Sequence, residues 1–276
     1  MVCGKQFVNR KSIDKYQIWI EYVEGKQTYL QLSKKYNIST KTIQRYLSEL
    51  KITKPIILPS NIVLLMDTTY FGRSFGVMLF KDALTGRNLL KYYVKNETNK
   101  LYAQGIDELL NMGFDIQAIV CDGRKGLLNL YTNIPTQMCQ FHQVAITRRY
   151  LTQNPKTEAG KELKAIVQWL KQTDKESFTG LLNGWEIRWE LFLKERTINP
   201  LNQKTQYTHR RLRRAIRSLK NNLPYLFTWY DYMHLKIPNT TNAIDGHFAN
   251  LKQKLRNHNG LSMRMKKQFI DEFLKA

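Results

Sequence analysis

Cysteine is scarce in this chain of 276 residues: Cys3, Cys121 and Cys139 are the three that occur, and they are widely spaced. Thiols this few and scattered exclude a disulfide framework and fit a reducing cytoplasm. Long apolar runs are also missing, since the longest, Ile62 to Met66, is far below the roughly 20 residues that span a bilayer. We expect a soluble, non-secreted protein with no membrane partner.

Acidic residues are half as frequent as basic ones, with 22 Asp and Glu against 44 Lys and Arg, which gives a formal charge of +22. A polyanion is the partner that such a charge favours, and nucleic acid fits better than an acidic protein or a membrane. The alternative is a ribosome-associated or merely basic protein. Hydrophobic residues make up 42% of the chain, so it has the material for a packed core.

Residues 1–50 read as a small helical domain. Apolar spacing predicts a first helix with Ser12 as its N-cap and Gly25 as its stop. A short helix from Tyr29, a break from Asn37 to Ser39 and a second helix to about Leu50 have the proportions of a helix-turn-helix. A plain helical hairpin is the alternative.

The second helix of this pair has a candidate base-reading face. Ser39 is its predicted N-cap, and Ile43 and Leu47 point inward. The outward residues that we expect to contact double-stranded DNA are Thr40, Lys41, Gln44 and Arg45.

Residues 51–61 contain two prolines and form a predicted linker, so a second domain covers residues 62–276. Its first part predicts three strands, a helix and a fourth strand, in the order βββαβ. These elements are Ile62–Met66, Ser74–Phe80, Asn88–Val94, the helix from Thr98 to Met112 with Gly113 as stop, and Ile116–Cys121. From Phe141 onward the pattern is helical, without a strand signal.

Both aliphatic strands of this domain run into a carboxylate, the first into Asp67 and the fourth into Asp122. A helical crossover sets parallel strands side by side, so their carboxyl ends can bring the two acids together. Carboxylates suit Mg²⁺ or Mn²⁺, and two such ions about 3.5 to 4 Å apart support phosphodiester chemistry. The alternative is that each Asp merely caps a turn.

A third acid is expected from a helix, and Asp245 lies in the run Thr240-Thr241-Asn242-Ala243-Ile244-Asp245-Gly246. With Asp67-Thr68-Thr69 and Cys139-Gln140-Phe141-His142, this run resembles the Mutator-like DDE transposases of bacterial insertion sequences. The resemblance implies an α/β fold with a ribonuclease H-like mixed sheet, interrupted by a helical insertion at about 143–238 between the second and third acids.

In such transposases, the resemblance implies, the three acids bind two Mg²⁺ ions that serve DNA cleavage and strand transfer. Cys139, His142 and Asn242 are then accessory residues near the active site, and a dimer or larger oligomer assembles on transposon ends and target DNA. One departure is that the family has Glu where this chain has Asp245. Asp245 is therefore a metal ligand, a helix-surface residue or part of a decayed site.

Zinc is not expected, because a structural site takes four ligands and Cys139 with His142 supplies half of one. The run from Cys3 to Phe7 resembles the end of a zinc ribbon, of which one cysteine remains, so the chain begins in a truncated remnant.

Two further basic surfaces are candidates for phosphate contact, with a solvated basic face as the alternative. They are Arg210, Arg213, Arg214 and Arg217 at helical spacing, and Lys252, Lys254 and Arg256 beyond the third acid.

These observations predict a transposase that binds terminal repeats and cuts and joins DNA, in a bacterial cytoplasm and associated with the nucleoid. The alternative is a DNA-binding repressor, or an inactive relic that uses only the helix-turn-helix.

Overall fold

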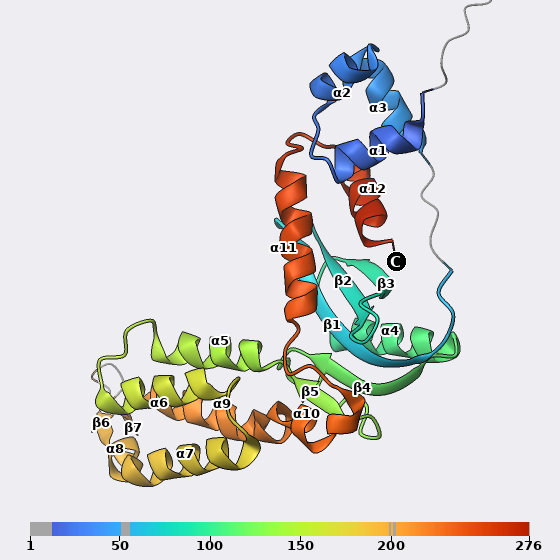
Figure 1. Cartoon of the computed structure of the whole chain (residues 1–276). Coiled ribbons are helices and arrows are strands. Elements are labelled where there is room, and N and C mark those ends of the chain that lie inside the picture. Colours follow the sequence, from blue (N-terminus) through green and yellow to red (C-terminus); the bar gives the residue numbers. More distant parts are fainter. Residues whose placement is uncertain (1–12, 51–55, 199, 201–202, 276) are drawn as a thin grey trace, which may run out of the picture. The chain divides into compact units, whose positions relative to one another are not determined.

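The structure, a computed structural model, describes residues 13–50, 56–198, 200 and 203–275. The chain divides into two compact units (Figure 1). The central unit is Ile57–Gly246, and the terminal unit combines the described residues of Met1–Ile56 with those of His247–Ala276. The described residues from His247 onward, which the sequence assigned to the second domain, thus group with the N-terminal helices instead.

A mixed five-stranded sheet forms the centre of the central unit, in the order β3-β2-β1-β4-β5. Neighbours β1, β2 and β3 pair antiparallel, whereas β4 is parallel to both β1 and β5. The strands are β1 (Asn61–Phe71), β2 (Phe75–Asp82), β3 (Asn88–Val94), β4 (Asp115–Cys121) and β5 (Thr136–Met138). The predicted βββαβ order is confirmed, and the fold is a mixed α/β fold.

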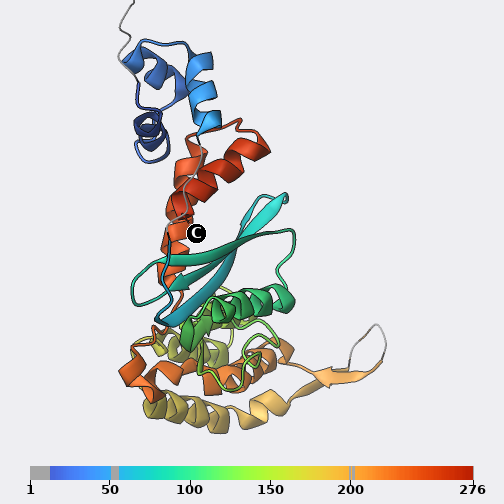
Figure 2. The same ribbon diagram turned by 90° about the vertical axis from the view of Figure 1, so that its right-hand side faces the viewer.

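Helix α4 (Asn99–Asn111) lies along one face of this sheet (Figure 2). Thr98 caps it by accepting from the amide of Leu101, and Gly113, with φ of +89°, follows its end, as the sequence predicted. At Gly105 an added Cβ would collide with the ring of Phe80 on β2. Glycine therefore lets the helix approach the sheet closely.

A helical subdomain occupies the region between β5 and the third predicted acid, as expected. Its elements are α5 (Gln140–Leu151), α6 (Glu158–Trp169), α7 (Lys175–Arg188), α8 (Glu190–Lys194), α9 (Arg210–Leu226), α10 (Thr228–Asp231) and the 3₁₀ turn η1 (Met233–Leu235). No helix in the described ranges combines the length and apolar composition that a membrane crossing requires.

One expectation for this region is wrong, because strand structure does occur in it. Strands β6 (Arg196–Ile198) and β7 (Thr205–Tyr207) form an antiparallel pair that extends away from the helices (Figure 2). Each strand has three residues, and all six are exposed or half-buried. The alternation of apolar and polar residues that reveals a half-buried strand is therefore missing.

The terminal unit contains α1 (Lys15–Val23), α2 (Tyr29–Tyr36), α3 (Thr40–Glu49) and α12 (Met263–Leu274), with most of α11 (Asn242–Arg256). Asp14 caps α1; Ser12, the predicted cap, lies outside the described residues, as do Cys3–Phe7 and residues 51–55 of the linker. Ser39 caps α3, and Ile43 and Leu47 are fully buried, as predicted.

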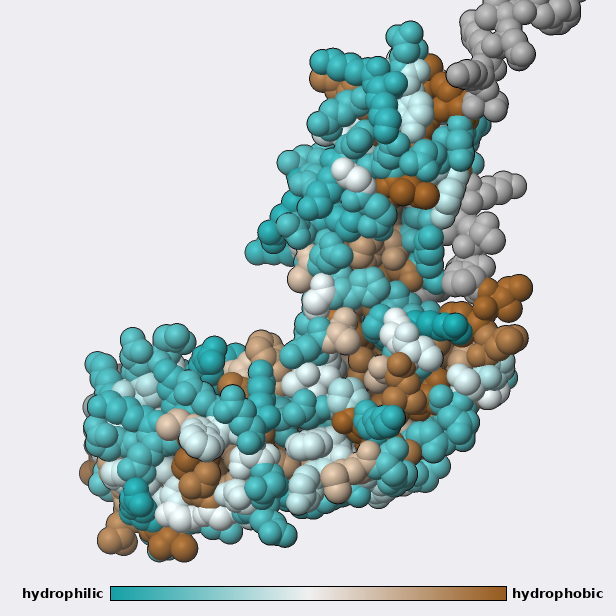
Figure 3. All heavy atoms as spheres, in the orientation of Figure 1, coloured by the Kyte–Doolittle hydropathy of each residue, from teal (hydrophilic) through white to brown (hydrophobic). Residues whose placement is uncertain are grey.

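The surface is mostly hydrophilic on the face drawn in Figure 3. This agrees with a chain in which Lys and Arg are twice as frequent as Asp and Glu. Such a surface suits a partner that is itself charged and hydrated.

Candidate active site

Asp67 and Asp122 lie beside each other at the sheet because of the register between β1 and β4. The parallel pairing ends at Leu65 opposite Val120. Asp67 lies two residues further along β1, and Asp122 directly follows the end of β4. The expectation that the first strand ends at Asp67 is wrong, since β1 continues to Phe71 against β2. The acid marks where β1 loses its parallel neighbour, not where the strand stops.

The surroundings of Asp67 disfavour its charged form. Burial, together with the carboxylates of Asp245 and Asp122, raises the pKa of Asp67 to about 7, although the amide of Thr68 donates to its Oδ1 at 2.8 Å. Like charges held this close make each other harder to ionise. The three acids predicted from the sequence therefore interact electrostatically in one site.

Asp245 enters this site from the first turn of α11, and Thr241 connects it to the sheet. The hydroxyl of Thr241 is 3.2 Å from Asp245 Oδ2 and 3.3 Å from Cys139 Sγ, and its amide also donates to that sulfur at 3.3 Å. Cys139 follows β5 and donates its amide to the carbonyl of Cys121 at 2.8 Å. The cysteine thereby ties the start of α11 to the strand that leads into Asp122.

His142, on the first turn of α5, interacts electrostatically with two of the acids, Asp67 and Asp122. The side chain of Cys139 and the carboxylates of Asp67 and Asp122 raise the pKa of His142 to about 9. Burial works against ionisation of the Cys139 thiol, but His142 and Thr241 lower its pKa overall. Asn242, the remaining predicted accessory residue, is exposed at the start of α11.

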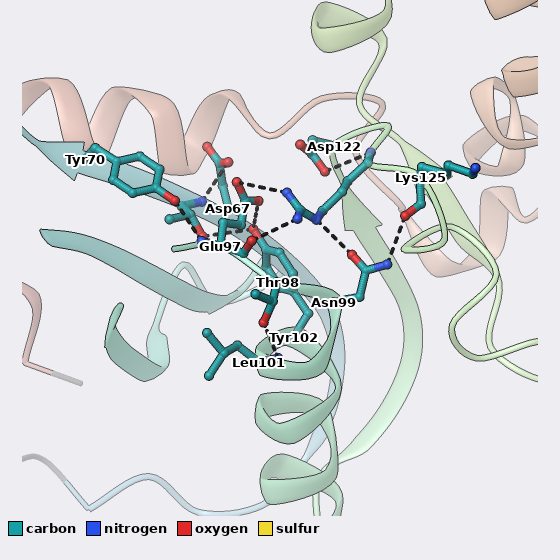
Figure 4. Close-up of polar contacts among 11 residues, drawn as sticks. Asp67, Tyr70, Glu97, Thr98, Asn99, Leu101, Tyr102, Asp122 and Lys125 are labelled. Carbon is teal, nitrogen blue, oxygen red and sulfur yellow. Dashed lines mark hydrogen bonds and ion pairs between the residues drawn. The ribbon is translucent and has the colours of Figure 1, made fainter. Parts of the chain in front are cut away.

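A fourth acid, Glu97, lies in the same region and was not predicted (Figure 4). Tyr102 donates its hydroxyl to Glu97 at 2.7 Å, and the guanidinium of Arg124 is 3.7 Å from the carboxylate. Burial and the nearby Asp122 raise the pKa of Glu97. A sequence signal exists, since Glu97 directly precedes the helix cap Thr98.

A basic cavity of about 640 Å³ opens beside Asp122, between the loop after β4 and the helices α5 and α9. Its side-chain cations come from three separate segments, and no carboxylate belongs to its lining. They are Arg124, Lys125, Arg149, Arg214 and Arg217. Arg124 is engaged with Asn99 and Glu97, while its amide donates to Asp122 at 3.1 Å. The cavity and the acids therefore share the loop that follows β4.

The four arginines predicted as one surface on α9 line a common pocket with Tyr207, but they differ in their contacts. Arg214 and Arg217 are exposed and line the basic cavity. Arg213 donates to the carbonyl of Leu193 and packs 3.7 Å from the ring centre of Tyr207, and Arg210 donates to Gln206. The first pair remains available to a polyanion, whereas Arg210 and Arg213 hold the hairpin strand β7 against α9.

The basic residues of α11 also differ from one another. Arg256 is exposed and Lys252 is half-buried. Lys254 is 6% exposed and forms an ion pair with Glu24 at 2.5 Å, so its charge is already neutralised inside the terminal unit. On α3, by contrast, Thr40, Lys41, Gln44 and Arg45 are all exposed, as predicted.

The donor chemistry of the acid site suits a hard divalent cation. Asp67, Asp122 and Asp245 offer carboxylate oxygens, and their mutual repulsion is a cost that a bound cation would offset. Within the described ranges, no group of three or more Asp, Glu, His or Cys side chains already stands in metal-holding geometry. Carboxylate oxygens are the ligand type that Mg²⁺ and Mn²⁺ prefer, but the described side chains are not arranged as a metal site.

Comparison with known proteins gives little further information. No protein-family model and no curated protein matches the chain. Among solved structures, one similar chain belongs to a cryo-EM structure of the simian T-cell lymphotropic virus intasome in complex with the PP2A regulatory subunit B56 gamma. The identity is 11% and the TM-score 0.25, over 56% of this chain and 67% of that chain. A likeness this weak carries no functional argument.

Proposed function

We propose that this protein is a DDE-type DNA transposase that binds transposon ends and catalyses metal-dependent DNA cleavage and strand transfer. The observation that carries the proposal is that Asp67 on β1 interacts electrostatically with both Asp122, which follows β4, and Asp245 on α11. Three acids from three separate elements are what two-metal phosphodiester chemistry needs.

The sheet supports a ribonuclease H-like core. The order β3-β2-β1-β4-β5, with β2 antiparallel to its neighbours and β4 parallel to β1, is the arrangement that the sequence resemblance leads one to expect. The helical insertion between Asp122 and Asp245 agrees with the same resemblance.

Within this proposal, Asp67, Asp122 and Asp245 would hold Mg²⁺ or Mn²⁺, which supplies activation of the attacking oxygen and stabilisation of the leaving oxygen. His142 balances part of the negative charge, and Thr241 with Cys139 orients Asp245. The basic cavity binds phosphates of the DNA next to the acids, and the exposed face of α3 reads base edges.

The proposal is tested by measuring Mg²⁺-dependent nicking of a duplex that carries the inverted repeats flanking the coding region. Asp67→Ala and Asp122→Ala should each abolish nicking and leave duplex binding intact. Asp115→Ala is the matched control, because Asp115 is an exposed aspartate at the opposite end of β4. Nicking that survives both active-site substitutions would refute the catalytic assignment.

A DNA-binding relic or repressor is the second candidate, and the shorter third acid favours it. Aspartate reaches one methylene less far than the family's glutamate, and a displacement of about 1 Å can cost on the order of 100-fold in rate. A relic binds duplex DNA without nicking it, and Asp245→Glu restores cleavage. A repressor stays inactive with that substitution.

The proposed activity also implies partners and a location. Joining two transposon ends requires two active sites, so we propose a dimer or larger assembly on DNA. Access to chromosomal DNA places such an enzyme at the bacterial nucleoid in the cytoplasm.

A further inference from the structure

A cavity of about 570 Å³ lies within the terminal unit, directly against the base-reading face of α3. Its α3 wall consists of Lys41, Gln44, Arg45 and Ser48. Their spacing of three and four residues puts them on one side of the helix. The cavity therefore opens on the face that the sequence predicts to contact DNA.

The opposite wall comes from the other end of the chain. Residues 257–262, which connect α11 to α12, line the cavity together with Met265. Asn257 and Asn259 are exposed in this segment, and Gly260 has φ of +84°, a value that glycine adopts without strain. Segments far apart in sequence thus share one polar surface.

Direct contacts hold this segment against the helix-turn-helix. The ring of His258 packs 4.1 Å from the ring of Tyr22 on α1, and His258 is 7% exposed. On α12, the side-chain amide of Gln268 donates to the carbonyls of Leu47 and Leu50 at 2.9 and 3.2 Å. These carbonyls belong to the end of α3, where backbone acceptors lack helical partners. The C-terminal segment is therefore a fixed part of the recognition unit.

The polar groups around the cavity suit DNA in particular. Gln44, Asn257 and Asn259 carry amides, while Lys41 and Arg45 carry positive charge, and none of the residues in its lining is acidic. Asn and Gln pair with adenine and Arg with guanine in the major groove. His258 adds a buried Nε2 atom that has no hydrogen-bond partner among the described residues. Such a group gains from a partner that the bound ligand supplies.

We propose that residues 257–262 form part of the DNA-reading surface, with Asn257 and Asn259 contacting the same duplex as Gln44 and Arg45. The inference rests on the proposed function only in its DNA-binding part, and it needs no catalysis. It assigns base recognition to a composite of both ends of the chain and not to α3 alone.

The test is selection of preferred duplexes by the full-length protein from a random library of about 30 base pairs, nearly three helical turns. Affinity for the selected duplex is then measured by fluorescence anisotropy. We expect the double variant Asn257→Ala/Asn259→Ala to bind it about tenfold more weakly and to lose preference at positions next to those that Gln44→Ala relaxes. Asn111→Ala, an exposed asparagine at the end of α4, is the matched control and should leave both measurements unchanged.

Each other result has a distinct meaning. Unchanged affinity and preference in the double variant overturn the inference, and so does tighter binding, which would mean that the segment covers α3. Both asparagines are exposed, so the variant should keep the thermal stability of the unaltered protein. If the unaltered protein selects no duplex, the proposed function fails as well. If it binds but does not nick DNA, only the catalytic proposal fails.

Discussion

Two cavities of this protein, one in each unit, differ strongly in the charge of the residues that line them. In the central unit, Arg124, Lys125, Arg149, Arg214 and Arg217 surround a cavity beside crowded carboxylates. In the terminal unit, Lys41 and Arg45 supply the lysine and arginine charge, and amides and hydroxyls supply most of the other polar groups. In the proposed function, the first surface would bind DNA through charge, and the second through the direction of its hydrogen bonds.

The difference separates affinity from sequence preference. Contacts between cations and phosphates bind any duplex and weaken with salt, whereas amide contacts to base edges discriminate among sequences. Variants of the central unit should therefore respond to metal, pH and salt. Variants of the terminal unit should respond to DNA sequence and to packing.

The largest expected effect concerns the acids of the central unit. Asp245→Ala should lower Mg²⁺-dependent nicking by at least about 100-fold, because it removes a proposed metal ligand. Glu97→Gln should cost less, since Glu97 is already engaged by Tyr102 and Arg124. Single-turnover nicking rates measure both. The reverse ranking would identify Glu97 as the third ligand.

The charge repulsion at Asp67 predicts a pH dependence of stability. A carboxyl whose pKa rises from 3.8 to about 7 on folding binds its proton more tightly in the folded state. The free energy of unfolding therefore falls as pH rises through that interval. In EDTA, Asp67→Asn should melt at a higher temperature than the unaltered protein above pH 7, and the two should converge near pH 4.

Melting curves with added Mg²⁺ test whether Asp67 is also a ligand of the proposed metal site. It should raise the melting temperature of the unaltered protein at pH 8 and have a smaller effect on Asp67→Asn, because a ligand of the proposed site is lost. If the difference in melting temperature between the two proteins stayed the same at every pH, with and without Mg²⁺, the electrostatic account of the site would be contradicted.

The basic cavity should contribute to the salt dependence of duplex binding. Arg214→Ala/Arg217→Ala should weaken duplex binding roughly tenfold at low salt and make the slope of log K against log[salt] shallower by about 2. Arg188→Ala/Lys194→Ala removes the same charge from residues already paired with Glu162 and Glu190, and should have little effect. Equal slopes for both variants would mean that net charge alone governs binding.

The smallest effect is expected in the terminal unit and should be insensitive to salt. Gln268→Ala leaves the carbonyls of Leu47 and Leu50 without their side-chain donor and should cost about 1 kcal/mol of stability. Thermal unfolding at low and high salt measures it, with the exposed Gln253→Ala as control. If this loss of stability depended strongly on salt, charge interactions would also contribute to the stability of the terminal unit.

Much of the fold follows from local sequence signals. Continuous aliphatic runs identify β1 and β4, and Thr98 with Gly113 delimits α4, because burial and capping act on neighbouring residues. The hairpin of β6 and β7 escapes detection since neither strand is buried. The full length of β1 also escapes, because its last residues pair with β2 on one side only.

The acids of the candidate site are proposed from the sequence, whereas most of their surroundings come only from the tertiary structure. Asp67, Asp122 and Asp245 each lie in a recognisable local pattern. Arg124 and Lys125 directly follow Asp122-Gly123, a signal that was available. Arg149 meets Arg214 only through the packing of α5 against α9, and Lys254 meets Glu24 only because the chain ends join. Contacts of this kind depend on tertiary structure and produce no periodic pattern in the sequence.

The terminal unit, built from both ends of the chain, has a consequence for synthesis. Helices α1, α2 and α3 leave the ribosome well before the residues that complete the unit, from His258 to Leu274. An unfinished polypeptide already carries Asp67 and Asp122 yet lacks the segment that packs against α3. The proposed recognition surface is thus incomplete until α12 has been synthesised, so truncated products that end before α12 would lack part of it.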